Sequence, residues 1–196
     1  MARQRGPWLV HEARQAYQNP WIAVTEHDVT RPDGQPGVYG VVNFANLAMA
    51  ILPVFEGGSI MLVGQHRFPQ DRYSWEIPEG GGPLADDPLA SARRELKEET
   101  GLSAENWREI LRMDLSNSVT DEAAIGYLAT GLTRGEAEPE GTEELETRQV
   151  PFRAALEDVS KGVISDALTV AMLLRAYYMA QEGELDRALA NAMLGR

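Results

Sequence analysis

The sequence predicts an α/β or α+β fold, in which helices pack against a mixed β-sheet. Three observations lead to this prediction. Runs of β-branched and aromatic residues alternate with helical segments along the chain. The early runs come in pairs separated by turn residues, which is typical of hairpins. The 196 residues are 43% hydrophobic and 24% charged, a composition that suits a globular chain with one sizeable core.

Strands are expected mainly in the first half of the chain. Residues 20–45 hold two of them, because the turn-rich "RPDGQPG" separates "WIAVTEHDVT" from "VYGVVNF". The apolar runs "LAMAILPVF" and "SIMLVGQHRF" follow, and the "EGG" between them predicts a second hairpin. Later strands are expected in "YSWEIPEGGG", which ends in a glycine loop, in "AAIGYLATGL" and in "EELETRQVPF".

Four helices complete the prediction. The first covers residues 88–100, because Asp87 is a favourable N-cap, Pro88 suits the first helical position and Gly101 ends the pattern. The others cover about 153–160, 165–181 and 183–194.

The charge and the residue content exclude several functional classes. The formal net charge of −12 argues against binding to nucleic acid or to anionic membranes, which both require a basic surface. It leaves small anionic substrates open, because a bound metal ion reverses the local field. Cysteine is absent, which excludes disulfides and thiolate metal sites. The start of the chain lacks an apolar signal segment and no apolar run approaches a membrane span, so we expect a cytoplasmic protein.

The stretch "RRELKEETGL" places three glutamates, Glu95, Glu98 and Glu99, on the first predicted helix. Like charges this close on a helix repel each other. They form an arc beside the apolar stripe that faces the core, which consists of Leu89, Ala92 and Leu96. Carboxylates in that position can converge above the preceding glycine loop, where Mg²⁺ or Mn²⁺ would find oxygen ligands. The alternative is an ordinary solvated helix face.

The wider spacing favours the metal site. The pattern Gly80-x5-Asp86-x7-Arg-Glu-Leu-x-Glu-Glu-x-Gly-Leu, which ends at Leu102, resembles the signature of the Nudix hydrolases. That signature is Gly-x5-Glu-x7-Arg-Glu-U-x-Glu-Glu-x-Gly-U, where U is a bulky aliphatic residue. Eight of its nine specified positions match, and Asp86 is the exception. The resemblance implies a Nudix α/β/α sandwich with a mixed β-sheet over residues 47–196. It also implies a small N-terminal β-subdomain over residues 1–46, which serves dimerisation and base binding.

The segments around the motif narrow the resemblance. "NPWIAVTEHDV", "VGQHRFP", "WEIPEGGG" and "GVISDALTVAMLLRA" are similar to the ADP-ribose and nucleoside-diphosphate-sugar pyrophosphatases, over most of residues 19–178. This similarity implies a homodimer that hydrolyses a nucleotide sugar to a nucleoside monophosphate and a sugar phosphate. Two alternatives stay open, a hydrolase of modified nucleoside triphosphates and a Nudix-fold sensor that binds nucleotide sugars without turnover.

The resemblance also implies roles for the motif residues. Glu95 and Glu99 would be the principal ligands of Mg²⁺ or Mn²⁺, and Glu98 would bind metal or position the nucleophilic water. The backbone carbonyl of Glu79 would complete the metal shell. Arg94 would pair with a motif carboxylate and hold it in place.

Outside the motif, Arg67 is expected to contact the phosphates or the ribose of the substrate. The catalytic base of this group usually comes from an acidic loop late in the chain, here "EAEPEGTEELE". The alignment of the following strand makes Glu143 the first candidate, with Glu140 and Glu144 as competitors.

Aromatic residues of the N-terminal portion are candidates for base recognition. Trp21, Tyr39 and Phe44 would stack on the nucleobase, from the partner subunit in many related dimers, or else they belong to the core of the strands. Ser118 stands where enzymes specific for ADP-ribose carry a proline, sixteen residues after the motif. The missing proline weakens an ADP-ribose assignment and leaves other nucleotide sugars open.

Overall fold

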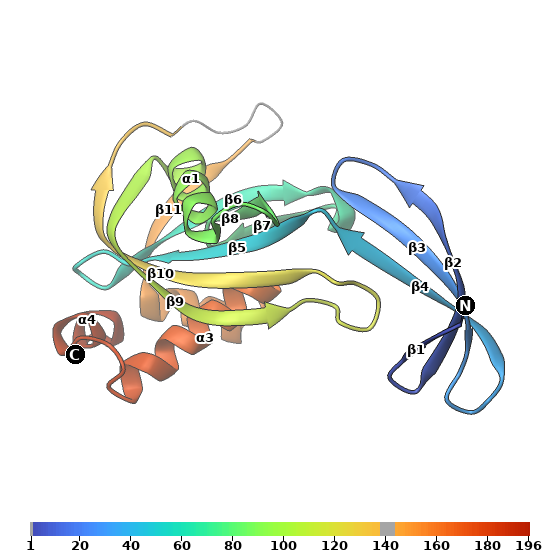
Figure 1. The fold of residues 1–196 in the computed structure, drawn as a ribbon. Helices are drawn as coiled ribbons and strands as arrows, with labels where there is room; N and C mark the ends of the chain where they lie inside the picture. Colours follow the sequence, from blue (N-terminus) through green and yellow to red (C-terminus); the bar gives the residue numbers. More distant parts are fainter. Residues whose placement is uncertain (1, 138–143) are drawn as a thin grey trace. The chain divides into compact units, whose positions relative to one another are not determined.

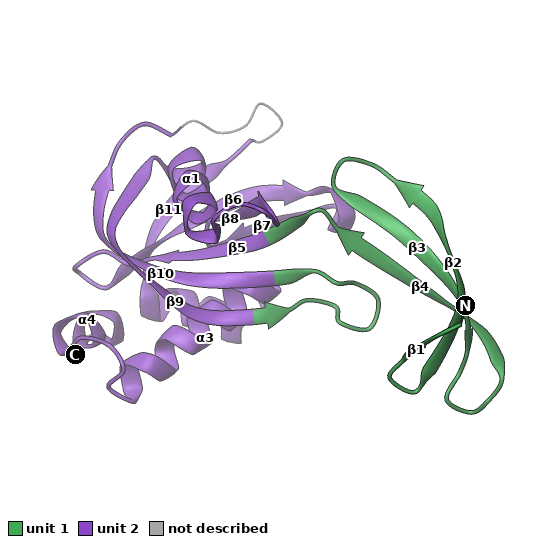
Figure 2. Ribbon diagram, viewed as in Figure 1, with its two compact units in different colours: residues 1–47, 113–123 green, residues 48–112, 124–196 purple. Residues whose placement is uncertain are grey.

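A computed structural model of the chain describes residues 2–137 and 144–196 (Figure 1). The chain divides into two compact units (Figure 2). The first comprises Met1–Leu47 together with Met113–Ala123, and the second comprises Ala48–Arg112 together with Ala124–Arg196. Both helices and sheets are present, so the predicted α/β class is confirmed.

The first unit is built on one four-stranded antiparallel sheet. Its strands are β1 (Arg3–Arg5), β2 (Trp8–Gln18), β3 (Ile22–Thr30) and β4 (Pro36–Phe44), in the order β1-β2-β3-β4. The hairpin predicted in residues 20–45 is confirmed, with Ile22 opposite Phe44 and Thr30 opposite Pro36. β2 was not predicted, because its residues are exposed on both faces from His11 onward and the alternation that marks a half-buried strand is lost.

The second unit contains two further sheets. Their strands are β5 (Asn46–Pro53), β6 (Ser59–Arg67), β7 (Arg72–Glu76), β8 (Glu79–Pro83), β9 (Leu102–Asp114), β10 (Ala123–Arg134) and β11 (Glu146–Pro151). One sheet has the order β8-β5-β10-β9 and the other has the order β11-β6-β7. β10 runs parallel to β5, whereas β6 is antiparallel to both of its neighbours, so parallel and antiparallel pairings occur together.

The second predicted hairpin, between β5 and β6, is wrong in its pairing. The two strands follow each other closely but belong to different sheets, and Val54, just after β5, forms an isolated bridge with Ile60. Their central residues, among them Ile51 and Leu62, are completely buried. Continuous apolar runs are typical of strands that are covered on both faces, and such runs do not reveal the partner strand.

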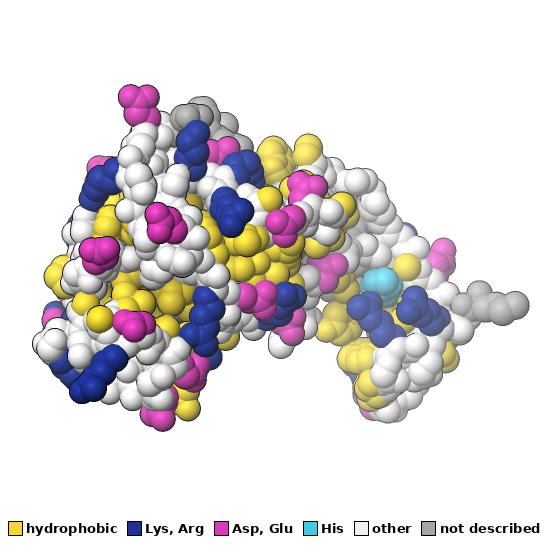
Figure 3. Space-filling model, turned by 60° about the vertical axis from the view of Figure 1, so that its left-hand side comes forward, with side chains coloured by type: hydrophobic (Ala, Val, Ile, Leu, Met, Phe, Trp, Pro, Cys, Tyr) yellow, Lys and Arg dark blue, Asp and Glu magenta, His cyan; other side chains and the backbone are white. Residues whose placement is uncertain are grey.

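The four predicted helices are confirmed. They are α1 (Pro88–Thr100), α2 (Phe152–Ser160), α3 (Ala167–Gln181) and α4 (Arg187–Leu194), and a 3-10 turn, η1, covers Phe68–Gln70. Within the second unit, α1 lies on one side of the sheets and α3 and α4 lie on the other (Figure 1). None of the helices within the described ranges is long and apolar enough to cross a membrane. On the face drawn in Figure 3, acidic and basic side chains are interspersed.

Candidate active site

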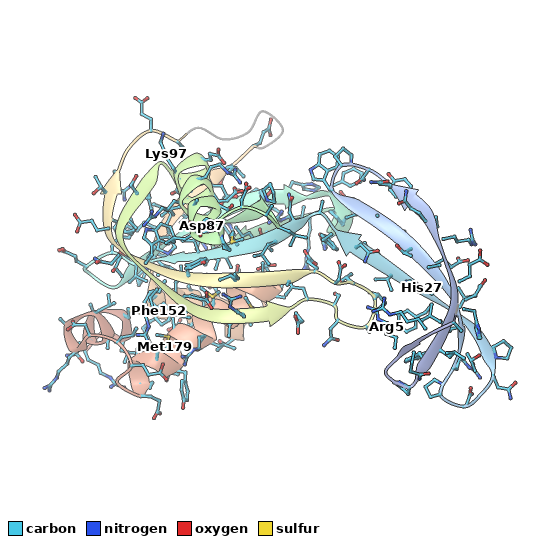
Figure 4. All side chains as sticks on the ribbon, in the orientation of Figure 1. Arg5, His27, Asp87, Lys97, Phe152 and Met179 are labelled. Carbon is cyan, nitrogen blue, oxygen red and sulfur yellow. The ribbon has the colours of Figure 1, made fainter. Side chains whose placement is uncertain are left out.

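The candidate site is built on one face of α1, whose two ends are well defined. The Asp87 side chain accepts hydrogen bonds from the N–H groups of Leu89 and Ala90, and Gly101 ends the helix with a φ of 67°. Figure 4 labels Asp87 and Lys97, near opposite ends of the helix. Because the caps determine where the helix begins and ends, they also determine which way its glutamates point.

The three motif glutamates lie at graded depths. Glu99 is 4% exposed, whereas the side chains of Glu95 and Glu98 are 12% and 26% exposed. Ala92 and Leu96 are completely buried and hold the helix against the core. The arc therefore runs from the core towards the surface, so Glu99 lies deeper than the border position expected from the helical wheel.

The start of β8 approaches the glutamates closely. The backbone N–H of Glu79 donates to Oε2 of Glu99 at 3.0 Å. A Cβ atom on Gly80 would lie 2.5 Å from Oε1 of Glu95, well inside van der Waals contact. Any larger residue at position 80 would therefore displace the Glu95 carboxylate, and this approach, not a left-handed backbone, is what favours glycine there.

Arg94 holds two of the motif carboxylates. Its Nη1 donates to Oε2 of Glu98 at 2.5 Å, and its Nη2 donates to Oε1 of Glu95 at 2.5 Å and to the carbonyl of Gly81 at 2.9 Å. The guanidinium group thus links the helix to β8. The single positive charge of Arg94 offsets only part of the negative charge that the three motif carboxylates carry when ionised. Carboxylate oxygens that gather against the gap left at Gly80 are a donor set that fits a hard divalent cation.

A second cluster of charges surrounds Arg67. Its Nε donates to both carboxylate oxygens of Glu76, and its Nη2 donates to Oε2 of Glu76 and to Oε1 of Glu79, each at 2.5 Å. Carboxylate oxygens of Glu76, Glu79 and Asp166 lie within 4.8 Å of one another. Sequence reasoning did not find this network, because its members come from β6, β7, β8 and the N-cap of α3.

The environment of Glu79 disfavours its ionised form. Burial raises the pKa of its carboxyl well above the ordinary value, and the negative charges of Asp166, Glu76 and Glu99 act in the same direction. Arg67 opposes this shift of the pKa. The Glu79 carboxyl thus lies between the guanidinium group of Arg67, which it binds, and neighbouring carboxylates, which repel its negative charge.

The residues expected to recognise the base belong to the first unit. Trp21 is 66% exposed, which leaves its indole ring accessible. The Tyr39 hydroxyl donates to the carbonyl of Ser118 at 2.6 Å, and its ring meets the Trp8 ring edge to face at 5.2 Å. Phe44 is half-buried. The loop that carries Ser118 is thus tied to β4 by a residue predicted to bind substrate.

Tyr39 also lines a cavity of about 260 Å³ in the first unit. The other side chains that line this cavity include Trp8, His27 and Arg5, and Figure 4 labels the last two.

Among the late-loop candidates for the base, Glu143 and Glu140 lie outside the described residues. Glu144 is described and exposed, just before β11. Asp86 is also exposed, and its backbone N–H donates to the carbonyl of Pro83 in the turn before α1. The Asp86 side chain, which is shorter than the glutamate of the family signature, therefore lies outside the buried contacts of the motif.

Comparisons with known proteins agree with this geometry. The family model of the NUDIX domain matches residues 45–168, and that of the nucleoside diphosphate sugar hydrolase N-terminal domain matches residues 8–42. Together these two models match most of the chain.

Two relatives are similar over most of their length. The CMP-5'-(N-acetyl-N-hydroxy-3-aminopropyl)phosphonate hydrolase of Streptomyces rubellomurinus is 30% identical over 155 residues, which cover 79% of this chain and 75% of that protein. The ADP-ribose pyrophosphatase of Mycobacterium tuberculosis is 34% identical over 153 residues, covering 76% and 73%. The crystal structure of an ADP compounds hydrolase matches with a TM-score of 0.79 at 17% identity, over 90% of this chain and 96% of that one, which shows the same fold.

Proposed function

The chain belongs to the Nudix hydrolase family, and we propose that it hydrolyses the pyrophosphate bond of a nucleoside diphosphate linked to a sugar. The observation that carries this proposal is the approach of Glu95 and Glu99 to the start of β8, with Glu98 joined to that strand through Arg94. The chain also matches the N-terminal domain of nucleoside diphosphate sugar hydrolases. The products would be a nucleoside monophosphate and a sugar phosphate. ADP-ribose is one candidate substrate, and other nucleotide sugars are candidates because Ser118 replaces the marker proline.

The motif residues would hold the metal. Glu95, Glu99 and Glu98 would supply carboxylate oxygens, and Glu79 would supply its backbone carbonyl. A bound Mg²⁺ or Mn²⁺ neutralises phosphate charge and increases the acidity of a water molecule. The ion pairs that Arg94 makes with Glu95 and Glu98 keep both carboxylates in one orientation, which supports this assignment.

The reaction is a displacement by water at phosphorus. An O–P bond forms to the water, the bridging O–P bond breaks, and the proton of the water passes to a carboxylate base. Glu98 would orient the water, and Glu143 would take the proton, with Glu140 and Glu144 as the other candidates. Arg67 would bind phosphate or ribose oxygens.

Recognition of the base and assembly are further parts of the proposal. Trp21 and Tyr39 would contact the nucleobase, and aromatic stacking suits any base. The exposed ring of Trp21 supports its role, whereas Tyr39 is already engaged with Ser118. We expect a cytoplasmic homodimer.

A substrate panel tests the function. The protein is incubated with Mg²⁺ and ADP-ribose, GDP-mannose, ADP-glucose, UDP-glucose or modified nucleoside triphosphates, and the products are separated by chromatography. Turnover of a diphosphate sugar is expected. A clear preference for triphosphates would contradict the proposal and favour a hydrolase of modified nucleoside triphosphates. Tight binding without turnover would favour the Nudix-fold sensor.

Two variants test the site. Glu98→Gln and Glu99→Gln should each lower kcat by orders of magnitude, because each removes a carboxylate charge from the proposed metal site. Circular dichroism checks that the fold is intact. Glu157→Gln is the matched control, since Glu157 is an exposed residue of α2 in the same unit, and it should leave kcat unchanged. Near-parental rates in both motif variants would contradict the assignment.

A further inference from the structure

The side chain of Glu79 has a feature that its backbone role does not require. Its Oε1 accepts a hydrogen bond from Arg67 at 2.5 Å, while its Oε2 is completely buried and has no hydrogen-bond partner within the described part of the chain. A buried carboxylate oxygen without a partner lowers the stability of the fold. The role proposed for the Glu79 carbonyl needs no side chain, so the carboxylate calls for an explanation of its own.

The backbone of Glu79 is held from two directions. Its N–H donates to Oε2 of Glu99, and the carbonyl of Pro78 just before it accepts a hydrogen bond from the N–H of Ile51 at 2.9 Å. A side chain that starts from an anchored backbone and ends in a hydrogen bond is a short, rigid connection. It joins the motif glutamate to Arg67.

Glu76 and Glu79 together orient the guanidinium group of Arg67. Glu76 binds Nε and Nη2, and Glu79 binds Nη2 from its other side. The remaining nitrogen, Nη1, donates no hydrogen bond to any residue in the described ranges, and 34% of the Arg67 side chain is exposed. The Nε–Nη2 edge of the guanidinium group is thus committed to the protein, and the two N–H donors of Nη1 stay available to a ligand.

We propose that Glu79 is a positioning residue, whose carboxylate directs Nη1 of Arg67 towards the phosphate oxygens of the substrate. The inference rests on the proposed function and deepens it. It gives Glu79 two separate tasks, with the carbonyl directed to the metal and the side chain directed to the arginine. Phosphate recognition and the motif glutamates are then coupled through one residue.

Three variants separate contact from charge. Glu79→Asp keeps the negative charge but withdraws the carboxylate from Arg67 by about the length of one methylene group. Glu79→Gln keeps the length and an acceptor oxygen but removes the charge. Arg67→Ala removes the group that is positioned, and Glu157→Gln serves again as the exposed control.

The first readout is the affinity for inorganic pyrophosphate, measured by calorimetry, which needs no turnover. We expect Glu79→Asp to raise the Kd about tenfold, in line with the loss of a hydrogen bond between charged groups. Glu79→Gln should raise it less. In the Arg67→Ala background, Glu79→Asp should change the Kd less than twofold, because the group that it positions is gone.

The second readout is steady-state hydrolysis of the best substrate of the panel. Glu79→Asp should act mainly through KM, and kcat should change less than threefold. The inference is overturned if Glu79→Gln binds pyrophosphate more weakly than Glu79→Asp does, since the charge of residue 79 would then matter more than its contact with Arg67. It is also overturned if Glu79→Asp has the same effect with and without Arg67, which would indicate a purely structural role.

A titration with Mn²⁺ followed by electron paramagnetic resonance tests one alternative explanation, in which the Glu79 carboxylate helps to bind a cation. The oxygens of Glu76, Glu79 and Asp166 lie close enough together to hold a cation, although Arg67 already pairs with two of these residues. Loss of one bound Mn²⁺ in Glu79→Gln, with the motif site intact, would overturn the positioning role. An inactive parent protein that binds pyrophosphate with the expected coupling would refute the proposed function and leave this inference standing.

Discussion

Replacement of Gly80 by alanine is the most direct test of the geometry at the motif. The added Cβ would lie 2.5 Å from Oε1 of Glu95. A carbon–oxygen contact needs about 3.4 Å, so the carboxylate or the strand must move by about 1 Å. The movement is resisted, because Nη2 of Arg94 holds the same oxygen at 2.5 Å and also binds the carbonyl of Gly81.

The expected effect is larger on activity than on stability. A displacement of about 1 Å in a catalytic arrangement lowers the rate about 100-fold. Overpacking of this kind lowers the free energy of unfolding by about 1–3 kcal/mol. Steady-state kinetics with the best substrate gives kcat, a Mn²⁺ titration gives the metal affinity, and thermal unfolding gives the stability.

Gly57→Ala is the control for this substitution. A Cβ atom on Gly57 meets no other atom within 4 Å, and its backbone is not in the left-handed region. Its kcat and metal affinity should stay within about twofold of the parent protein, as is usual for surface substitutions. If Gly80→Ala matched Gly57→Ala in both quantities, Glu95 would not be part of the metal site as we describe it.

The remaining predictions concern the start of α1 and a half-buried carboxyl. Asp87→Ala should lower the free energy of unfolding by about 1 kcal/mol, because two helix N–H groups lose their acceptor, and an unchanged thermal midpoint would refute this role. Burial raises the pKa of Glu122, so the folded state binds its proton more tightly than the unfolded state does, and the stability that this gives at low pH is lost as the pH rises through the folded pKa. Glu122→Gln should therefore raise the midpoint of thermal unfolding relative to the parent protein at pH 8 but not at pH 4. An equal shift at both pH values would contradict a raised pKa of Glu122 as the cause.

Much of the local structure could be predicted from the sequence. The limits of α1 follow from Asp87, Pro88 and Gly101, whose effects reach only a few residues. The β3–β4 hairpin follows from a turn between two β-rich runs. Each of these signals is contained in a short segment, so no knowledge of the rest of the chain is needed.

Sheet membership could not be predicted in the same way. β5 and β6 are adjacent in sequence and both rich in apolar residues, yet β5 pairs with β10 and β6 with β11, which come much later. β2 carries almost no burial signal, because most of its length is exposed. Pairing between distant strands depends on which surfaces the whole chain covers, and a single segment does not contain that information.

The features of the site also fall into those that the sequence predicts and those that need the folded chain. The family, the helix that carries the glutamates and the glycine that precedes them could be predicted from the sequence alone, because this motif is a local pattern of residue types and spacings. The folded chain was needed to show that Glu99 is buried against the N–H of Glu79, that Gly80 accommodates a carboxylate, and that Arg67 is held by Glu76 and Glu79. These contacts join separate strands to a helix, and their strength comes from burial and from charges that are brought together only when the chain is folded.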